Sequence, residues 1–596
     1  MRQAHWLKPN RGARAPERII AFDTETDSLP LGPGEVEAVL RFGWAVTSRR
    51  HRDNRWTPPR WHRFTTSGGF WGWLEGVLRD GERATLYAHN LGFDFRVVKG
   101  FSELPARGWT CRSAVIEDPP TILRWRKGRK GILALDTMNY SRSSLAEIGE
   151  QVGLPKLDPA ALVGSQAEAD AYCRRDAEIV LRFMQGFIGL IREWDLGYLA
   201  PTLAGQAFTA WRHRHLSVPI FIDAHPRALE LARRAYRGGR VEAFRIGVVE
   251  GPIEVFDVRS MYPSVMLTTA MPTVLRTWAR RMTVGELAAS AAQAAAVADV
   301  DLDTETADYP LVRDGKLIFP VGQFRTVLTS PELDHALARG RVTWVHEVAL
   351  YDRAVIFASY VREWHERRMS ALAAGDVEAA WQAKLMMNAL YGKLGQSGQV
   401  FETIGDADPA EARTWTEWDH DTGRRIGFRA IAGLVQRRGE ARESRDSHPA
   451  IAATVTAAAR MALLSLMEAP GRANVRYVDT DSLFVLREAC GPLWPLVAEA
   501  RLASLVHERT IDEFLVHTVK DYVRDDQRVI KGVRANAHEV SPGVFEQDMF
   551  VGLRGALRAG DMGVVTIRRV VKRLARGYDK GIVGPDGWVT PHRLSL

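Results

Sequence analysis

Residues 476–484 constrain this chain more than any other segment, because they carry two acidic residues within an apolar stretch. Apolar and aromatic residues on both sides of Asp479 and Asp481 predict two strands joined by a tight turn. Both carboxylates would then lie at the tip of one β-hairpin. Any fold that contains this segment must accommodate that acidic tip.

A second acidic pair follows the apolar run 19–22. Alternate residues of a strand share a face, so Asp23 and Glu25 would project together and Thr24 would point away. Adjacent carboxylates raise each other's pKa unless cations neutralise them, and Mg²⁺ suits ligand sets made only of oxygen. Taken alone, such a pair more often belongs to a solvated turn than to a metal site.

Two further segments place polar side chains in the same region. Asn90, Phe93 and Asp94 come directly after a predicted strand, and Tyr172 and Asp176 lie four residues apart on a predicted helix. That spacing puts the Tyr172 hydroxyl and the Asp176 carboxylate on one helix face.

Apolar patterning gives the coarse organisation of the chain. An α/β domain ending near residue 195 is indicated by strands at 19–22, 39–46 and 84–88, a turn at 29–34 and an amphipathic helix at 166–194. A mixture of strands and helices follows. The Ala-rich stretch 281–298 and the polar stretch 402–447 interrupt it and resemble insertions.

Composition is that of an ordinary globular protein, with 46% hydrophobic and 26% charged residues. Lys and Arg outnumber Asp and Glu by 80 to 72, which fits a polyanionic partner but is common in other enzymes. The three cysteines form no disulfide framework or zinc cluster. The basic N-terminus lacks the apolar stretch of a signal peptide, and no apolar run approaches membrane-spanning length. We therefore expect a soluble, cytoplasmic protein with no membrane partner.

Two more segments suggest a second acidic site. Residues 254–264 begin as a strand that carries Asp257 and end in a turn that contains Pro263. A helix further on presents three side chains on one face, at i, i+4 and i+7: Lys384, Asn388 and Tyr391.

In this order, the segments resemble the motifs of the family B DNA polymerases. Residues 23–25, 90–94 and 172–176 are similar to the DxE, Nx2(F/Y)D and Yx3D signatures of DEDD exonucleases. The other three segments are similar to DxxSLYP, Kx3NSxYG and YxDTDS, with Met261 in place of Leu and Ala389 in place of Ser. The resemblance covers nearly the whole chain and is closest to the protein-primed subgroup found in linear phages and plasmids.

For the N-terminal site, the resemblance implies a 3′→5′ exonuclease. Four carboxylates would hold two metal ions: Asp23, Glu25, Asp94 and Asp176. Tyr172 would orient the attacking water. Asn90 and Phe93 would hold the single-stranded 3′ end, and Thr137 and Lys156 would be further strand contacts.

For the second site, the resemblance implies nucleotidyl transfer with two ions, Mg²⁺ or Mn²⁺ in its place. The ligands would be Asp257, Asp481 and the Val258 carbonyl, with Asp479 nearby. The incoming nucleotide would meet four residues: Lys384 at the triphosphate, Tyr391 near the base pair, Tyr262, whose ring would exclude a ribose 2′-hydroxyl, and Asn388.

Further similarities concern DNA. Residues 236–239 resemble the YxGG motif between the two activities, and residues 520–522 resemble the KxY motif that holds the primer strand. Paired glycines let backbone amides approach phosphate. The DNA-binding residues expected on this ground are Tyr236, Gly238, Gly239, Thr480, Ser482, Lys520 and Tyr522. A family-like segment at 201–207 has no predicted role.

The expected fold is α/β and α+β in several domains. An RNase H-like 3′→5′ exonuclease domain would occupy 1–195, and a right-hand polymerase domain would occupy 196–596. The parts of the hand would be palm 196–268 and 446–525, first insertion 269–352, fingers 353–395, second insertion 396–445 and thumb 526–596.

Both insertions favour protein priming, because protein-primed relatives carry insertions at these two places. The expected partners are primer-template DNA, dNTPs and a terminal protein whose hydroxyl starts synthesis. The substrate would be a linear viral or plasmid genome, copied with strand displacement in the host cytoplasm if the element is viral. An enzyme that extends ordinary nucleic-acid primers and a nuclease with a degenerate polymerase half are the alternatives.

Overall fold

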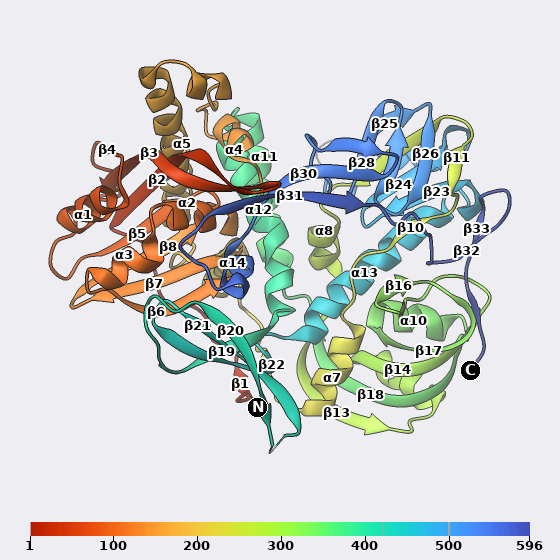
Figure 1. The fold of residues 1–596 in the computed structure, drawn as a ribbon. Helices are drawn as coiled ribbons and strands as arrows, with labels where there is room; N and C mark the ends of the chain where they lie inside the picture. The colour runs from red at the N-terminus through yellow and green to blue at the C-terminus, as the bar shows by residue number, and fades with distance from the viewer. Residues whose placement is uncertain (1, 118, 421, 499–500) are drawn as a thin grey trace.

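The computed structural model describes residues 2–117, 119–420, 422–498 and 501–596. In Figure 1 the N-terminal domain occupies one side of the molecule and the palm and first insertion occupy the other, with the helices of the fingers between them.

The N-terminal domain is a mixed sheet with helices on both faces. Along its second strand, Ile19 and Ala21 pack into the core on one face, and Ile20 and Phe22 pack into the core on the other. The elements are β1 His5–Trp6, β2 Arg18–Gly32, β3 Glu35–Arg49, β4 Arg60–Phe64, α1 Ser67–Val77, β5 Arg83–Ala88, α2 Leu91–Val97, α3 Gly100–Ala106, β6 Thr110–Ile116, β7 Thr121–Lys127, β8 Lys130–Asp136, α4 Leu145–Gln151 and α5 Gln166–Glu193.

The β2–β3 hairpin is longer than predicted. The expected turn at 29–34 is reduced to two residues, because β2 continues to Gly32 and β3 begins at Glu35. The outer end of β3 is supported by a strand from the far end of the chain, which pairs with residues 35–37. Patterning along β2 and β3 alone does not reveal that partner.

Strands from the C-terminal part extend the same sheet. β29 (His538–Ser541), β30 (Val544–Phe550) and β31 (Thr566–Arg573) give the order β29-β30-β31-β3-β2-β5-β8-β7-β6. Figure 1 shows β30 and β31 as a ribbon that reaches the N-terminal domain. Arg96, buried in α2, donates to the carbonyl of Val551 at 2.7 Å and also to that of Val564. The predicted thumb and the N-terminal domain therefore share one sheet.

The palm contains a sheet of order β10-β23-β24-β12-β25 and a smaller one of order β11-β26-β27-β28. The predicted turn at Pro263 is instead the first turn of a helix, where proline is tolerated. Thr202 caps the helix that contains most of segment 201–207. The elements are α6 Leu203–Arg214, β9 Phe221–Ile222, α7 Pro226–Ala235, β10 Val241–Ala243, β11 Gly247–Val249, β12 Ile253–Val258, α8 Met261–Thr268, α13 Pro449–Glu468, β23 Val475–Asp479, β24 Ser482–Leu486, β25 Leu505–Ile511, β26 Phe514–Thr518, β27 Asp521–Arg524 and β28 Gln527–Ile530.

One helix of the palm corrects an expectation about apolar runs. α13 has 20 residues, and an 18-residue window within it has a mean hydropathy of 1.7, so its length and composition would suffice to cross a membrane. Burial explains this composition differently, since 78% of the same window is buried inside the protein. Val455 and Leu463 of α13 lie in the main core with residues of β12 and β24. We therefore interpret α13 as the core helix of the palm.

The regions predicted as fingers and insertions are each built from regular elements. The fingers are two helices, α11 (Ala358–Ala373) and α12 (Val377–Leu394). The Ala-rich stretch belongs to a packed helix and strand of the first insertion, with Ala296 and Ala298 in its core. The insertion elements are β13 Met271–Arg280, α9 Val284–Ala291, β14 Ala295–Thr304, β15 Leu311–Arg313, β16 Lys316–Ile318, β17 Val321–Thr329, α10 Ser330–Ala338 and β18 Val342–Ala354 in the first, and β19 Ser397–Asp406, β20 Arg413–Asp419, β21 Arg424–Ile431 and β22 Leu434–Glu443 in the second.

The predicted thumb, 526–596, divides into two parts. After α14 (Leu553–Ala559) and β31, the chain returns across the palm through β32 (Ile582–Val583) and β33 (Val589–Thr590). It ends in β34 (Arg593–Leu594), which pairs with β17 of the first insertion. Gly587 permits this path, because it has a φ of +84° and an added Cβ would lie 2.3 Å from the Ile246 carbonyl oxygen. The tail is therefore a strap between palm and first insertion.

Candidate active sites

The first acidic site lies between β2 and α5. Asp23 and Glu25 project toward α5 with part of their surface exposed. Burial raises the pKa of Asp23 well above its usual range, and the charge of Asp94 adds to the effect. Burial and then Asp176 raise the pKa of Glu25 to about 7. These carboxylates are therefore crowded together, as predicted.

Thr24 corrects the expectation that it points away from the site. Its amide and hydroxyl both donate to Oδ1 of Asp94, at 3.1 and 2.6 Å. β5 pairs with β2 only as far as Ala21, so the backbone of Thr24 is open on that side. Burial raises the pKa of Asp94 to about 8, although the bond from Thr24 opposes this shift. Thr24 thus positions one of the four predicted ligands.

Asp176 completes the acidic group from α5. Its Oδ2 forms an ion pair with Lys156, and its Oδ1 is buried without a hydrogen-bond partner. Burial raises the pKa of Asp176 while Lys156 opposes the shift. The Lys156 ammonium also lies 4.7 Å from the ring centroid of Tyr172. Lys156, predicted to contact the DNA strand, therefore neutralises Asp176 in this structure.

The other residues predicted to hold the 3′ end differ in exposure. Asn90 starts α2 in the left-handed conformation, and its amide donates to Asp136 at 3.0 Å. The partly exposed ring of Phe93 packs edge-on against Phe550 of β30, with centroids 5.4 Å apart. Thr137 is fully buried and bonds His89 at 2.9 Å. In this structure Thr137 supports the site from inside, and its direct contact with DNA stays a prediction.

The second acidic site lies where β12 meets the β23–β24 hairpin. Asp257 is paired with Ser482 across the strands, and the Ser482 hydroxyl donates to Asp257 Oδ1 at 3.0 Å. Thr480 forms the turn with a φ of +62°, which places Asp479 and Asp481 at the tip. The amide of Val258 donates to the Asp481 carbonyl at 2.9 Å. The predicted hairpin is present, and the structure places it in register with Asp257 of β12.

Burial and mutual repulsion raise the pKa values of the carboxylates in this site as well. Burial, followed by the charge of Asp481, raises the pKa of Asp257 to about 6. Burial also raises the pKa of Asp481, and Asp479 adds to that shift. Lys520 lies 3.0 Å from Asp479 and is its ion-pair partner. A divalent cation between Asp257 and Asp481 would relieve both shifts, so the donor set fits the predicted ions.

Glu508 is a third carboxylate near Asp257 and Asp481 that the sequence analysis missed. Its charge raises the pKa of both. Pairing between β12 and β25 shifts register between Val255 and Phe256, where Glu508 is the extra residue on β25. Such a bulge re-aims a side chain toward the site. A bulge depends on the neighbouring strand, so no local pattern in residues 505–511 announces it.

Three predicted nucleotide contacts lie on the exposed face of α12. Lys384 is exposed, and its carbonyl accepts a bond from the side chain of Asn388 at 2.8 Å. The ring of Tyr391 stacks on that of Tyr262, with centroids 4.6 Å apart and planes 26° apart. Tyr262 comes from α8 of the palm, so this stack joins palm and fingers beside the second acidic site.

Comparison with known proteins agrees with this arrangement. Residues 166–410 match the family described as DNA polymerase type B, organellar and viral. The chain is 22% identical over 480 residues to the DNA-directed DNA polymerase of Enterobacteria phage PRD1, which is 80% of this chain and 78% of that protein. The resemblance to family B DNA polymerases is confirmed.

Solved structures of phi29 DNA polymerase have the same fold. The complex with primer-template DNA has a TM-score of 0.68 and 14% identity, covering 94% of this chain and 100% of that one. The ternary complex with DNA and incoming nucleotide has a TM-score of 0.66 and 15% identity over the same shares. The expected fold, an RNase H-like domain followed by a right-hand domain, is therefore confirmed.

The YxGG-like segment lies against the acidic hairpin. An added Cβ at Gly239 would meet Cγ2 of Thr480 at 2.8 Å, so the position requires glycine. Arg460 of α13 holds the segment, donating to the carbonyl of Gly238 at 2.7 Å. Arg460 is itself paired with Glu332 of the first insertion at 2.7 Å, and both side chains are 2% exposed. Sequence analysis missed this buried pair.

Lys520 and Tyr522 of the KxY-like segment both contact Tyr477 in the palm core. The Lys520 amide donates to the hydroxyl of Tyr477 at 2.9 Å. Tyr522 is 8% exposed, and its ring lies 5.3 Å from that of Tyr477. Tyr236 contacts the end of the fingers, since a Cβ at Gly395 would lie 2.5 Å from its ring. DNA contacts of Lys520, Tyr522 and Tyr236 stay predictions.

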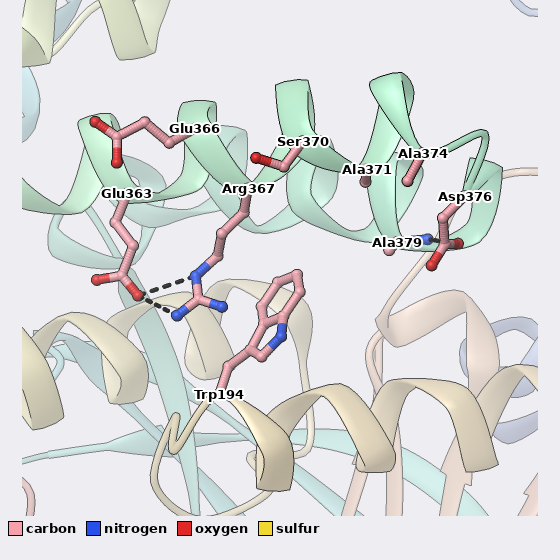
Figure 2. Close-up of a pocket in the computed structure, with 9 residues that line it drawn as sticks. All are labelled: Trp194, Glu363, Glu366, Arg367, Ser370, Ala371, Ala374, Asp376 and Ala379. Carbon is pink, nitrogen blue, oxygen red and sulfur yellow. Dashed lines mark hydrogen bonds and ion pairs between the residues drawn. The ribbon is translucent and has the colours of Figure 1, made fainter.

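A groove of about 580 Å³ lies apart from both acidic sites, between α11 and the end of α5. Figure 2 shows Arg367 between Glu363 and the ring of Trp194. Its Nε donates to Glu363 at 3.0 Å, and its guanidinium lies 4.2 Å from the Trp194 centroid. The groove lies where α11 packs against the end of α5 in the N-terminal domain.

Proposed function

We propose that this chain is a DNA-directed DNA polymerase that also removes nucleotides from the 3′ end of DNA. The observation that carries the proposal is that one chain holds two separate carboxylate groups on two different sheets. One contains Asp23, Glu25, Asp94 and Asp176, and the other contains Asp257 and Asp481. The family match supports the polymerase, and the geometry of the first group supports proofreading.

Both sites would take two Mg²⁺ ions, or Mn²⁺ in their place. When bound, such ions stabilise the entering and leaving oxygens of an in-line displacement at phosphorus. In the first site Thr24 holds Asp94 in place and Tyr172 would orient the attacking water. In the second site Ser482 holds Asp257, and Lys384 would meet the triphosphate as a point charge.

Primer extension tests this function directly. With a labelled primer on a longer template, Mg²⁺ and dNTPs, the primer should lengthen. Without dNTPs the same primer should shorten from its 3′ end. Shortening without any extension, at all dNTP concentrations, would instead favour a nuclease whose polymerase half is degenerate.

We further propose that synthesis starts on a protein hydroxyl, on a linear viral or plasmid genome in the cytoplasm. Both insertions are folded units: the second forms a sheet of its own, and the first forms a sheet that only β34 joins from outside. The resemblance implies insertions at these two places in protein-primed relatives. The first presents Trp344, which is 55% exposed. A large exposed aromatic is the kind of side chain that dominates protein interfaces.

Protein priming predicts a covalent protein–nucleotide adduct when the enzyme, the terminal protein, Mg²⁺ and one labelled dNTP are mixed without an oligonucleotide. Trp344→Ala should lower adduct yield by about fivefold or more while sparing primer extension. Trp418→Ala in the second insertion is a matched control, because Trp418 is also 55% exposed. Deleting residues 269–352 is a weaker test, since it removes the buried partner of Arg460. Efficient primer extension with no adduct from any candidate partner would favour an enzyme that extends ordinary nucleic-acid primers.

A further inference from the structure

Cys173 is a buried thiol in the first acidic site that the proposed nuclease chemistry does not use. It lies on α5, three residues before Asp176, and its Sγ is 3.5 Å from Oδ2 of Asp23. Asp23, Glu25 and Cys173 each offer one ligand atom, and all three atoms lie within 4.8 Å of one another. The group combines one soft donor with two hard ones.

The spacing of these atoms fits a tetrahedral zinc site. Zinc bonds of about 2.3 Å to sulfur and about 2.0 Å to oxygen at the tetrahedral angle place the two donor atoms about 3.5 Å apart. That value matches the observed distance from Sγ to Asp23 Oδ2 of 3.5 Å. An ion could reach the site from the exposed side, because Asp23 and Glu25 are only partly buried while Cys173 lies behind them.

A second observation points to a cation at the same place. Oδ1 of Asp176 is buried without a hydrogen-bond partner, and the residue is 3% exposed. The Asp176 charge acts on both Asp23 and Glu25, so it faces the same group. Lys156 pairs with the other oxygen, Oδ2, so Oδ1 is the atom of Asp176 left to bind a cation in the site.

We propose that Cys173, Asp23 and Glu25 bind a thiophilic divalent cation such as Zn²⁺, which displaces Mg²⁺ and stops 3′→5′ degradation while DNA synthesis continues. This inference rests on the proposed exonuclease function of the site. On binding, the thiol gives its proton to solvent and the thiolate becomes the ligand. Proofreading would then depend on the zinc concentration.

The two other cysteines provide matched controls. Cys111 is buried in the apolar core of the N-terminal domain, and Cys490 is buried in the core of the palm, with Sγ 3.2 Å from the carbonyl of Leu486. Within the described residues, neither belongs to a group of three metal-binding side chains. Serine at either position should therefore leave the proposed site intact.

Cobalt(II) titration of the metal-free full-length enzyme, without nucleic acid, tests the site. A thiolate ligand gives a sulfur-to-cobalt charge-transfer band in the near ultraviolet. We expect the band in the wild type, Cys111→Ser and Cys490→Ser, and its loss in Cys173→Ser and Cys173→Ala. Absence of the band from the wild type, or its persistence in the Cys173 variants, would overturn the proposal.

Zinc inhibition gives the functional readout. Each enzyme's degradation rate in Mg²⁺ serves as its own reference, and Zn²⁺ is then titrated. Cys173→Ser should need at least about tenfold more Zn²⁺ for half-inhibition than Cys490→Ser. Equal zinc sensitivity would overturn the regulatory role. If the cobalt band is present but neither the wild type nor any variant degrades DNA, the exonuclease assignment fails and the metal site stands.

Discussion

Replacing Asp23 and Glu25 together with alanine should lower 3′→5′ degradation at least about a thousandfold, while primer extension stays within about threefold of the wild type. The reason is that these carboxylates belong to the β2–α5 site and contribute nothing to the palm sheet. Conversely, Asp481→Ala should abolish extension to a similar degree and spare degradation. Both rates are measured on one labelled primer-template, with and without dNTPs.

Matched controls come from the same elements. Asp27 is exposed on β2 and Asp512 is exposed after β25, so Asp27→Ala and Asp512→Ala should retain both activities. Removing Asp23 and Glu25 relieves repulsion between crowded carboxylates, so the double variant should melt in EDTA no lower than the wild type. A folded double variant that has lost both activities would show that the two sites are not independent.

Tyr262→Val should relax discrimination against ribonucleotides roughly a hundredfold or more. The Tyr262 ring stacks on Tyr391, which limits its freedom to move away from a 2′-hydroxyl. Valine removes the ring and opens that space. The measurement is the ratio of kcat/KM for a dNTP to that for the matching rNTP, made in the Asp23→Ala, Glu25→Ala background so that degradation does not distort it.

Tyr262→Phe separates the ring from its hydroxyl. If the ring excludes the ribose, phenylalanine should keep the wild-type ratio. A ratio that is unchanged in Tyr262→Val would assign sugar selection to another residue. A ratio lost equally in Tyr262→Phe would assign it to the hydroxyl.

The local sequence was sufficient to predict a structural feature wherever that feature lies within one strand, turn or helix. The Asp479–Asp481 hairpin, the shared face of Lys384 and Tyr391 and the long helix with Asp176 all follow from periodicity and turn chemistry within a few residues. Their pairing into two sites came from family resemblance, because neither spacing nor composition places Asp94 beside Asp23.

Features that depend on a distant partner could not be predicted. Thr24 contacts Asp94 because β5 ends early, and Glu508 turns toward Asp257 because β25 is bulged against β12. The final strap was assigned to the thumb since its short strands resemble those before it. Its packing depends on Ile246 in the palm and on β17 in the first insertion, neither of which is near it in sequence.

The shared sheet of thumb and exonuclease domain also has a consequence for biosynthesis. Arg96 and its acceptor Val551 are 455 residues apart, and Val36 of β3 lies 567 − 36 = 531 residues before its partner Ile567 of β31. At about 5–20 residues per second, a ribosome needs roughly 20–90 s to add even the shorter of these stretches. Throughout that interval the nascent N-terminal domain presents an unpaired strand edge, which can pair with other chains. An exonuclease fragment that ends at residue 195 would keep that edge permanently.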